Sequence, residues 1–95
     1  MDIKIRDQTA LVSFQNISEL DKEKVTNGGL CPVFAEFDLE QWYLNRPDLI
    51  AGALRHAKYS KAFIRLVRDC VKAGARRISF GANQEPDPER PVFDW

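Results

Sequence analysis

The most distinctive chemical feature of the sequence is a set of basic side chains that recur at helical spacing. Successive members lie four, three and four residues apart, so a helix presents them as one ridge. The ridge consists of Lys61, Arg65, Arg68 and Lys72, and Arg76 and Arg77 follow just beyond it. Such a ridge can follow a phosphate backbone, or it can meet an acidic protein surface and speed association. The remaining interpretation is a solvated helix face balanced by charge elsewhere in the molecule.

The charge of the chain is strongly partitioned although its total is zero. Residues 1–54 carry five Lys/Arg against nine Asp/Glu, residues 55–77 carry eight against one, and residues 78–95 carry one against four. Segregated charge influences the choice of partner even when the total vanishes. Because nucleic-acid-binding modules usually have a basic total, this balance favours a protein partner with an acidic surface, with nucleic acid as the alternative.

Candidates for catalysis or metal binding are few. His56 is the only histidine, and the cations beside it disfavour its charged form. Cys31 and Cys70 have no zinc-like spacing with each other or with His56. Cys70 falls on the apolar side of the basic helix, where burial makes a thiol inert. We therefore expect no metal and no cofactor.

Three carboxylates alternate along one segment of the chain. Glu36, Asp38 and Glu40 would share one face of a strand, as in an acid/base pair or a divalent-cation site. A solvated strand face above a buried one explains the same alternation, and we favour it. No phosphate-binding loop is present, because Gly28 and Gly29 lack the partners of either nucleotide-binding pattern.

The first half of the chain predicts a hairpin, a short helix and two further strands. Alternation predicts strands over 3–6 and 10–14, joined by a turn at 7–9. Ser18 is a suitable cap for a helix over 19–25, and residues 26–29 form a break. Further strands are expected over 30–37 and 41–44, with a turn at 38–40.

The second half predicts helices followed by one strand. A helix begins near Pro47 and continues with apolar residues at helical spacing to Ala57. Tyr59 and Ser60 divide it from a second helix over 61–73, in which Tyr59 packs on Ile64 and Gly74 ends the helix. Residues 76–80 form a strand and 84–91 an extended loop. The aromatic end, 92–95, is expected to dock on the body.

Length and composition limit the class of protein. Ninety-five residues with 44% hydrophobic and 11% aromatic content suit one folded domain, which we expect to span residues 1–95. We predict an α+β fold: a small, mostly antiparallel sheet with one or two amphipathic helices packed on one face. No apolar run is long enough to span a membrane, and the first residues lack the features of a signal peptide. A cytoplasmic location is expected, without membrane contact.

The end of the chain resembles a known family. Residues 68–80 read Arg-Asp-Cys-Val-Lys-Ala-Gly-Ala-Arg-Arg-Ile-Ser-Phe, and residues 91–95 read Pro-Val-Phe-Asp-Trp. This last third is similar to small proteins of plasmids and integrative elements in proteobacteria, which end in Pro-x-aromatic-Asp-Trp and have no established activity. The resemblance implies an accessory protein of a mobile element, a class that includes inhibitors of host defence.

Three functional hypotheses follow. The preferred one is a non-enzymatic module that binds and inhibits a larger protein complex, for example as an anti-CRISPR protein, with the basic residues steering association and aromatic residues anchoring it. The second is nucleic-acid binding through the same ridge. The third is a small toxin-like ribonuclease using Lys58, Tyr59, Arg65 and Arg68.

Overall fold

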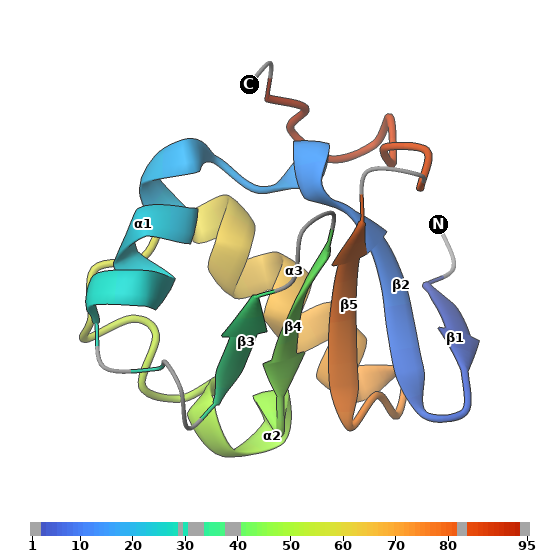
Figure 1. The fold of residues 1–95 in the computed structure, drawn as a ribbon, viewed down its shortest axis with the longest axis horizontal. Helices are drawn as coiled ribbons and strands as arrows, with labels where there is room; N and C mark the ends of the chain where they lie inside the picture. Colours follow the sequence, from blue (N-terminus) through green and yellow to red (C-terminus); the bar gives the residue numbers. More distant parts are fainter. Residues whose placement is uncertain (1–2, 29, 31–33, 38–40, 82–83, 94–95) are drawn as a thin grey trace.

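A mixed five-stranded sheet forms the framework of the protein (Figure 1). The computed structural model describes residues 3–28, 30, 34–37, 41–81 and 84–93. The strands are β1 (Lys4–Arg6), β2 (Thr9–Ser13), β3 (Ala35–Phe37), β4 (Gln41–Asn45) and β5 (Arg77–Gly81). Their order in the sheet is β1-β2-β5-β4-β3. Only the central β2–β5 pair is parallel, and the other neighbours are antiparallel.

The predicted N-terminal hairpin is confirmed. β1 and β2 pair with Arg6 opposite Thr9, which leaves Asp7 and Gln8 as the turn. Both turn residues have positive φ, 51° and 64°, as a two-residue turn matched to strand twist requires. β2 ends at Ser13, one residue earlier than expected, because Phe14 begins the short 3₁₀ turn η1 (Phe14–Asn16).

The two middle strands differ in length from the sequence prediction: β3 is shorter than expected, and β4 is one residue longer. Of the strand expected over 30–37, residues 35–37 form β3, and the N–H groups of Phe34 and Ala35 before and at its start both donate to the carbonyl of Leu30. Residues 31–33, with Cys31, and the turn expected at 38–40 lie outside the described residues. The strand expected over 41–44 is confirmed as β4, which continues to Asn45.

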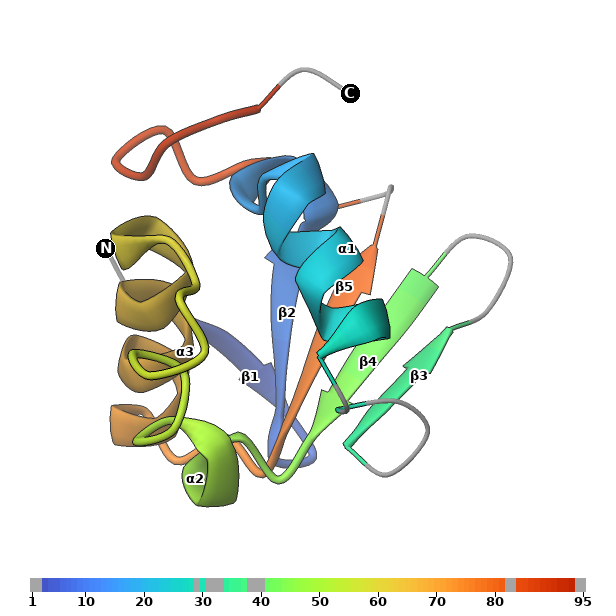
Figure 2. The same ribbon diagram turned by 90° about the vertical axis from the view of Figure 1, so that its left-hand side faces the viewer.

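Helices occupy one side of the sheet (Figure 2). α1 (Glu19–Asn27) begins after Ser18, as predicted, and lies beside the start of α3 (Lys61–Lys72). The prediction of a helix from Pro47 to Ala57 is wrong, because α2 covers only Pro47–Ile50 and is followed by turns. Ile50 and Leu54 in this region are buried. The apolar residues that suggested a continuous helix therefore contribute to the core from turns.

The core lies between the sheet and α3. Phe63, Leu66, Val67 and Cys70 on α3 are at most 1% exposed. The sheet contributes the residues that alternate toward this helix: Ala10, Val12, Trp42, Leu44, Ile78 and Phe80. The rings of Trp42 and Phe80 stack with centroids 4.1 Å apart. The α+β class is thereby confirmed, with a mostly antiparallel sheet.

The end of the chain crosses back over the body. Residues 84–93, which we call the strap, contain no helix or strand, as predicted for most of their length. The backbone N–H of Phe93 donates to the carbonyl of Gln15 at 2.7 Å, so the described part of the C-terminal end docks as expected. Asp94 and Trp95 lie outside the described residues. Within the described part of the chain, the helices are too short or too polar to cross a membrane.

Candidate functional site

Helix α3 is defined by local signals that also orient its basic residues. The Ser60 hydroxyl caps the helix by accepting a hydrogen bond from the Phe63 N–H at 3.2 Å. Gly74, with φ of 96°, follows the last turn as predicted. Tyr59 stacks on Phe63, with ring centroids 5.0 Å apart, one residue before the expected partner Ile64. Because one face of α3 is buried so completely, its cations must project to the opposite side.

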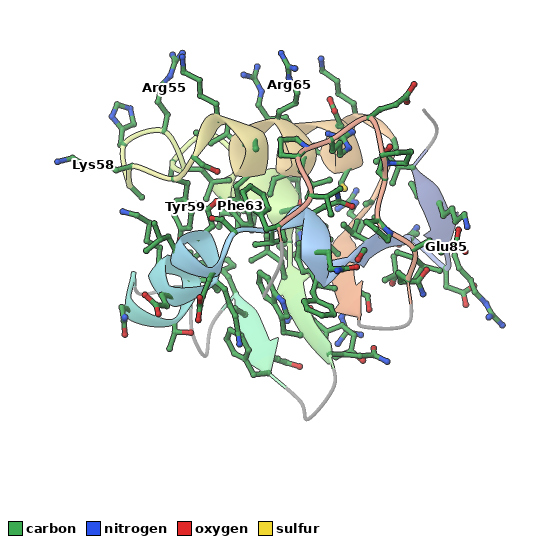
Figure 3. The ribbon with its side chains drawn as sticks, turned by 90° about the horizontal axis from the view of Figure 1, so that it is seen from above. Arg55, Lys58, Tyr59, Phe63, Arg65 and Glu85 are labelled. Atoms are coloured by element: carbon green, nitrogen blue, oxygen red, sulfur yellow. The ribbon has the colours of Figure 1, made fainter. Side chains whose placement is uncertain are left out.

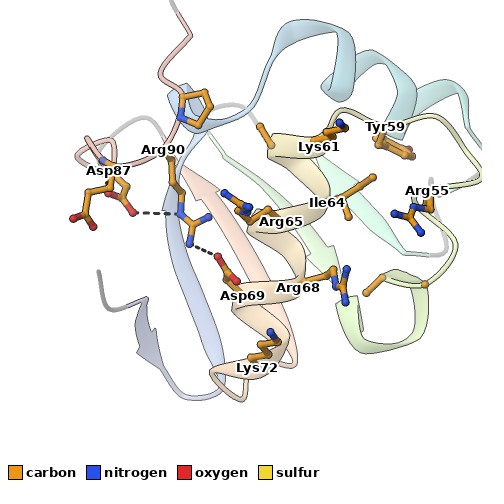
Figure 4. A pocket seen from close by; sticks show the side chains of 15 residues that line it. Arg55, Tyr59, Lys61, Ile64, Arg65, Arg68, Asp69, Lys72, Asp87 and Arg90 are labelled. Atoms are coloured by element: carbon orange, nitrogen blue, oxygen red, sulfur yellow. Dashed lines mark hydrogen bonds and ion pairs between the residues drawn. The ribbon is translucent and has the colours of Figure 1, made fainter.

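A broad open groove runs along this outward face (Figure 4). One wall is the turn region that contains Ala51, Gly52 and Arg55, and the other wall is the strap at residues 87–91. The floor is α3 itself, with Ala62 and Ile64 as its apolar part. The groove has a volume of about 1340 Å³, beyond the ~300–1,000 Å³ of most small-molecule sites. Its size and openness suit a segment of a macromolecule. We call it the α3 groove.

The α3 groove is positively charged. It is lined by three acidic residues, Asp69, Asp87 and Glu89, and by six basic ones: Arg55, Lys61, Arg65, Arg68, Lys72 and Arg90. Arg90 is neutralised, since its guanidinium pairs with Asp69 at 2.7 Å and with Asp87 at 3.3 Å. The other five cations have no ion pair within the described residues. Their charge is therefore available to a partner.

The wall formed by the strap is held by specific polar contacts. Asn16 is 3% exposed and accepts a hydrogen bond from the Asp87 N–H at 2.8 Å. Its side-chain amide donates to the carbonyls of Asp87 and Pro91, at 3.2 and 3.0 Å. A buried amide with both of its polar atoms satisfied fixes the adjacent backbone. The groove consequently keeps its second wall without a ligand.

The structure brings together four of the six basic residues singled out from the sequence. Lys61, Arg65, Arg68 and Lys72 all line the α3 groove. Arg76 is exposed in the connection before β5, outside the groove lining. Arg77 lies on the far side of the sheet, because Ile78 faces the core and strand residues alternate between faces. The basic ridge and Arg77 therefore belong to different surfaces.

The other chemical candidates do not converge on one point. Figure 3 shows Arg65 projecting away from the sheet, Lys58 projecting sideways and Tyr59 lying inward beside Phe63. Tyr59 is 7% exposed, so its ring is a core residue. The exposed Glu36 faces Arg77 at 3.8 Å, whereas Asp38 and Glu40 lie outside the described residues. Of the four ribonuclease candidates, Tyr59, Arg65 and Arg68 line the α3 groove, whereas Lys58 does not.

The cysteine and histidine candidates are also separated. Cys70 is fully buried, and burial raises the pKa of its thiol to about 12. His56 is exposed in the turn region before α3. No cluster of three His, Cys, Asp or Glu side chains with metal-binding geometry occurs among residues 3–28, 30, 34–37, 41–81 and 84–93.

Two basic residues of the groove were not identified from the sequence. Arg55 belongs to a region predicted as helix, and only the turns after α2 bring it beside Ile64. Arg90 stands alone among acidic residues, and its contact with Asp69 spans 21 positions of the chain. Neither contact has a local sequence pattern that would reveal it.

Comparison of the chain with protein-family models, with curated proteins and with solved structures finds no match.

Proposed function

We propose that this protein is a binding module that holds an acidic, extended segment of a larger protein in the α3 groove. The observation that carries the proposal is a row of cations on α3 that have no ion pair with any residue the structure describes. The row lies between two walls, beside apolar surface at Ala62 and Ile64. Carboxylates of a partner would pair with Arg65 and Arg68, and small apolar side chains would cover Ile64. Complementary charge would also accelerate the encounter.

The acidic wall favours protein over nucleic acid at this site. Asp87 and Glu89 belong to the strap, and both line the α3 groove together with the basic ridge. A continuous phosphate backbone in the groove would pass close to the carboxylate of Glu89 and be repelled, whereas the charge of Asp87 is balanced by Arg90. A protein segment has discrete charges and can place a basic or neutral residue there.

Inhibition is the form of activity that fits a module of this size. By occupying a surface on a larger complex, a protein of 95 residues can block it without catalysis. A counter-defence inhibitor of the anti-CRISPR kind is one such form, and that specific role is suggested only by the resemblance of residues 68–95 to proteins of mobile elements.

A titration with two probes of equal charge tests the proposal. Isotope-labelled protein is titrated with a fluorescent peptide of alternating Glu and Leu residues, and separately with a single-stranded oligonucleotide. We expect the peptide to shift the amide resonances of Ala62, Arg65 and Arg68. The variant R65E/R68E reverses two charges of the groove, and its affinity for the peptide should be about ten-fold or more lower.

The matched control changes the same charge on another surface. Lys4 and Arg6 are exposed on β1, outside the α3 groove. The variant K4E/R6E should bind the peptide within about two-fold of the unmodified protein. Equal loss in both double variants would mean that total charge, not the groove, governs binding. Displacement of the peptide from α3 by the oligonucleotide would assign the ridge to nucleic acid.

A further inference from the structure

The two faces of the sheet have different chemistry. Helices and the core cover one face, and the other is left uncovered by helices within the described residues (Figures 1 and 2). Strand pairing assigns to this uncovered face the residues that alternate with the core positions. They are Lys4, Arg6, Thr9, Leu11, Ser13, Glu36, Gln41, Tyr43, Asn45, Arg77, Ser79 and Gly81, which we call the open sheet face.

A cation and an aromatic ring are stacked at the centre of this face. The guanidinium carbon of Arg77 lies 3.9 Å from the centroid of the Tyr43 ring. The side chain of Arg77 is 41% exposed, whereas Tyr43 is half-buried, so the guanidinium covers the ring and is itself partly open to solvent. A flat guanidinium above an aromatic ring is a platform on which a further planar group can stack.

Polar contacts hold this platform in place. The Tyr43 hydroxyl donates to the side-chain oxygen of Gln41 at 2.9 Å. Glu36, directly opposite Tyr43 on β3, pairs with the Arg77 guanidinium at 3.8 Å. Gln41 lies on the same strand as Tyr43, and Glu36 lies on β3, two strands from Arg77, so each residue of the platform has a polar partner within the sheet.

The same face carries cations at a distance that suits a nucleic-acid backbone. Arg6 pairs with Thr9, which pairs with Arg77, so Arg6 lies two strands from the platform. At ~4.8 Å between neighbouring strands this separation is about 10 Å. Lys4 and Arg6 are exposed and have no ion pair among the described residues. Among the described strand residues of the face, three cations stand against one carboxylate, Glu36. Glu85 of the strap lines a pocket together with Lys4 at the edge of the face.

We propose that the open sheet face binds single-stranded nucleic acid, with a base stacked on the Arg77–Tyr43 platform and phosphates contacted by Lys4 and Arg6. Base stacking on an aromatic or guanidinium plane tolerates any sequence. The exposed Gln41 and the half-buried Asn45 provide hydrogen-bonding groups around the platform. Leu11 is the one aliphatic side chain of this face, so a protein partner would lack a hydrophobic anchor.

This surface is separate from the one proposed for the acidic protein segment. Arg65 on α3 and Arg55 in the turn region before it both project away from the sheet (Figure 3). The open sheet face lies on the other side of the molecule. The two proposals can therefore succeed or fail independently, and each double variant is the control of the other.

Fluorescence anisotropy tests the second surface. Labelled 12-nucleotide RNA and DNA strands of mixed sequence are titrated with the protein at 50 and 200 mM salt. We expect binding at low salt that weakens as salt rises, because phosphate contacts release counterions. The variant K4E/R6E should lose about ten-fold or more in affinity, whereas R65E/R68E should stay within about two-fold.

Substitutions at the platform separate stacking from general charge. Tyr43→Phe keeps the ring and should retain the affinity within about two-fold. Tyr43→Leu removes the π surface and should weaken binding by about five-fold or more, while circular dichroism checks that the fold is intact. Equal affinity of the Phe and Leu variants would overturn the stacking role. If R65E/R68E loses affinity for nucleic acid and K4E/R6E does not, the binding site lies on α3 and not on the open sheet face. Absence of binding at 50 mM salt would overturn the proposal outright.

Discussion

The carboxylate of Asp21 in α1 accepts two hydrogen bonds from Ser60, which lies 39 positions later at the start of α3. The Ser60 N–H donates at 3.0 Å and its hydroxyl donates at 2.5 Å. Ser18 donates its own hydroxyl to Asp21 at 2.7 Å. One buried carboxylate, 3% exposed, thus joins the caps of two helices, close to the positive end of each helix dipole. This contact fixes α3, and with it the groove.

Removing the Asp21 carboxylate is predicted to destabilise the fold. Asp21→Ala leaves the hydroxyls of Ser18 and Ser60 without their buried acceptor, which costs about 2–4 kcal/mol of unfolding free energy. Urea denaturation measures this loss. Glu23→Ala, an exposed acidic position on the same helix, is the control and should change stability by less than about 0.5 kcal/mol. Equal effects of the two substitutions would contradict the capping role.

Arg90 is predicted to hold the strap against α3. Arg90→Ala removes the ion pairs with Asp69 and Asp87, in which the Arg90 side chain is only 15% exposed. Amide hydrogen exchange of Phe93, whose N–H bonds to Gln15, should accelerate by about ten-fold or more. Arg46→Ala removes an exposed pair with Asp48 and should leave this exchange rate unchanged. An unaltered rate in Arg90→Ala would show that Asn16 alone secures the strap.

The buried thiol of Cys70 is predicted to make stability depend on alkaline pH. Burial raises its pKa from 9.0 to about 12 in the folded protein. The unfolded chain therefore loses the proton first as pH rises, and the contribution of the thiol to stability declines between about pH 9 and pH 12. One such group gives a slope of at most about 1.4 kcal/mol per pH unit.

A single-thiol background isolates this effect. In Cys31→Ser protein, Cys70 is the only remaining thiol, and a further Cys70→Ala substitution removes it. The difference in unfolding free energy between these two proteins should shrink as pH rises above 9. Folded Cys31→Ser protein should also react with iodoacetamide far more slowly than the same protein in urea. Fast alkylation of the folded state would contradict the burial of the thiol.

Two glycines are predicted to respond oppositely to alanine. Gly74 has φ of 96°, in the left-handed region, so Gly74→Ala should cost about 1 kcal/mol. A Cβ at Gly52 would meet no atom within 4 Å, and its backbone lies outside the left-handed region. Gly52→Ala should therefore be neutral or stabilising by up to about 1 kcal/mol, because it restricts the unfolded chain. Thermal unfolding of both variants measures these changes in stability. A larger loss of stability in Gly52→Ala than in Gly74→Ala would contradict the prediction.

Elements with local signals could be predicted from the sequence. Ser60, the apolar stripe of α3 and Gly74 specify a helix within about 15 residues, so the ridge from Lys61 to Lys72 was predictable. The same holds for the hairpin of β1 and β2. The region after Ile50 was not predictable in this way, because its apolar spacing fits a helix while the structure uses turns.

The sequence by itself determined that the chain has an amphipathic basic helix, a mostly antiparallel sheet and a partition of charge. Only the tertiary structure decided which charges share a surface. Arg77 follows the ridge in the chain but stacks on Tyr43 across the sheet, because the pairing of β5 with β4 brings them together. Arg90 closes the groove through Asp69, and Asp21 joins two helices through Ser60. Such contacts arise between distant positions, so the periodicity of a single segment, which reports only its own buried face, contains no information about them.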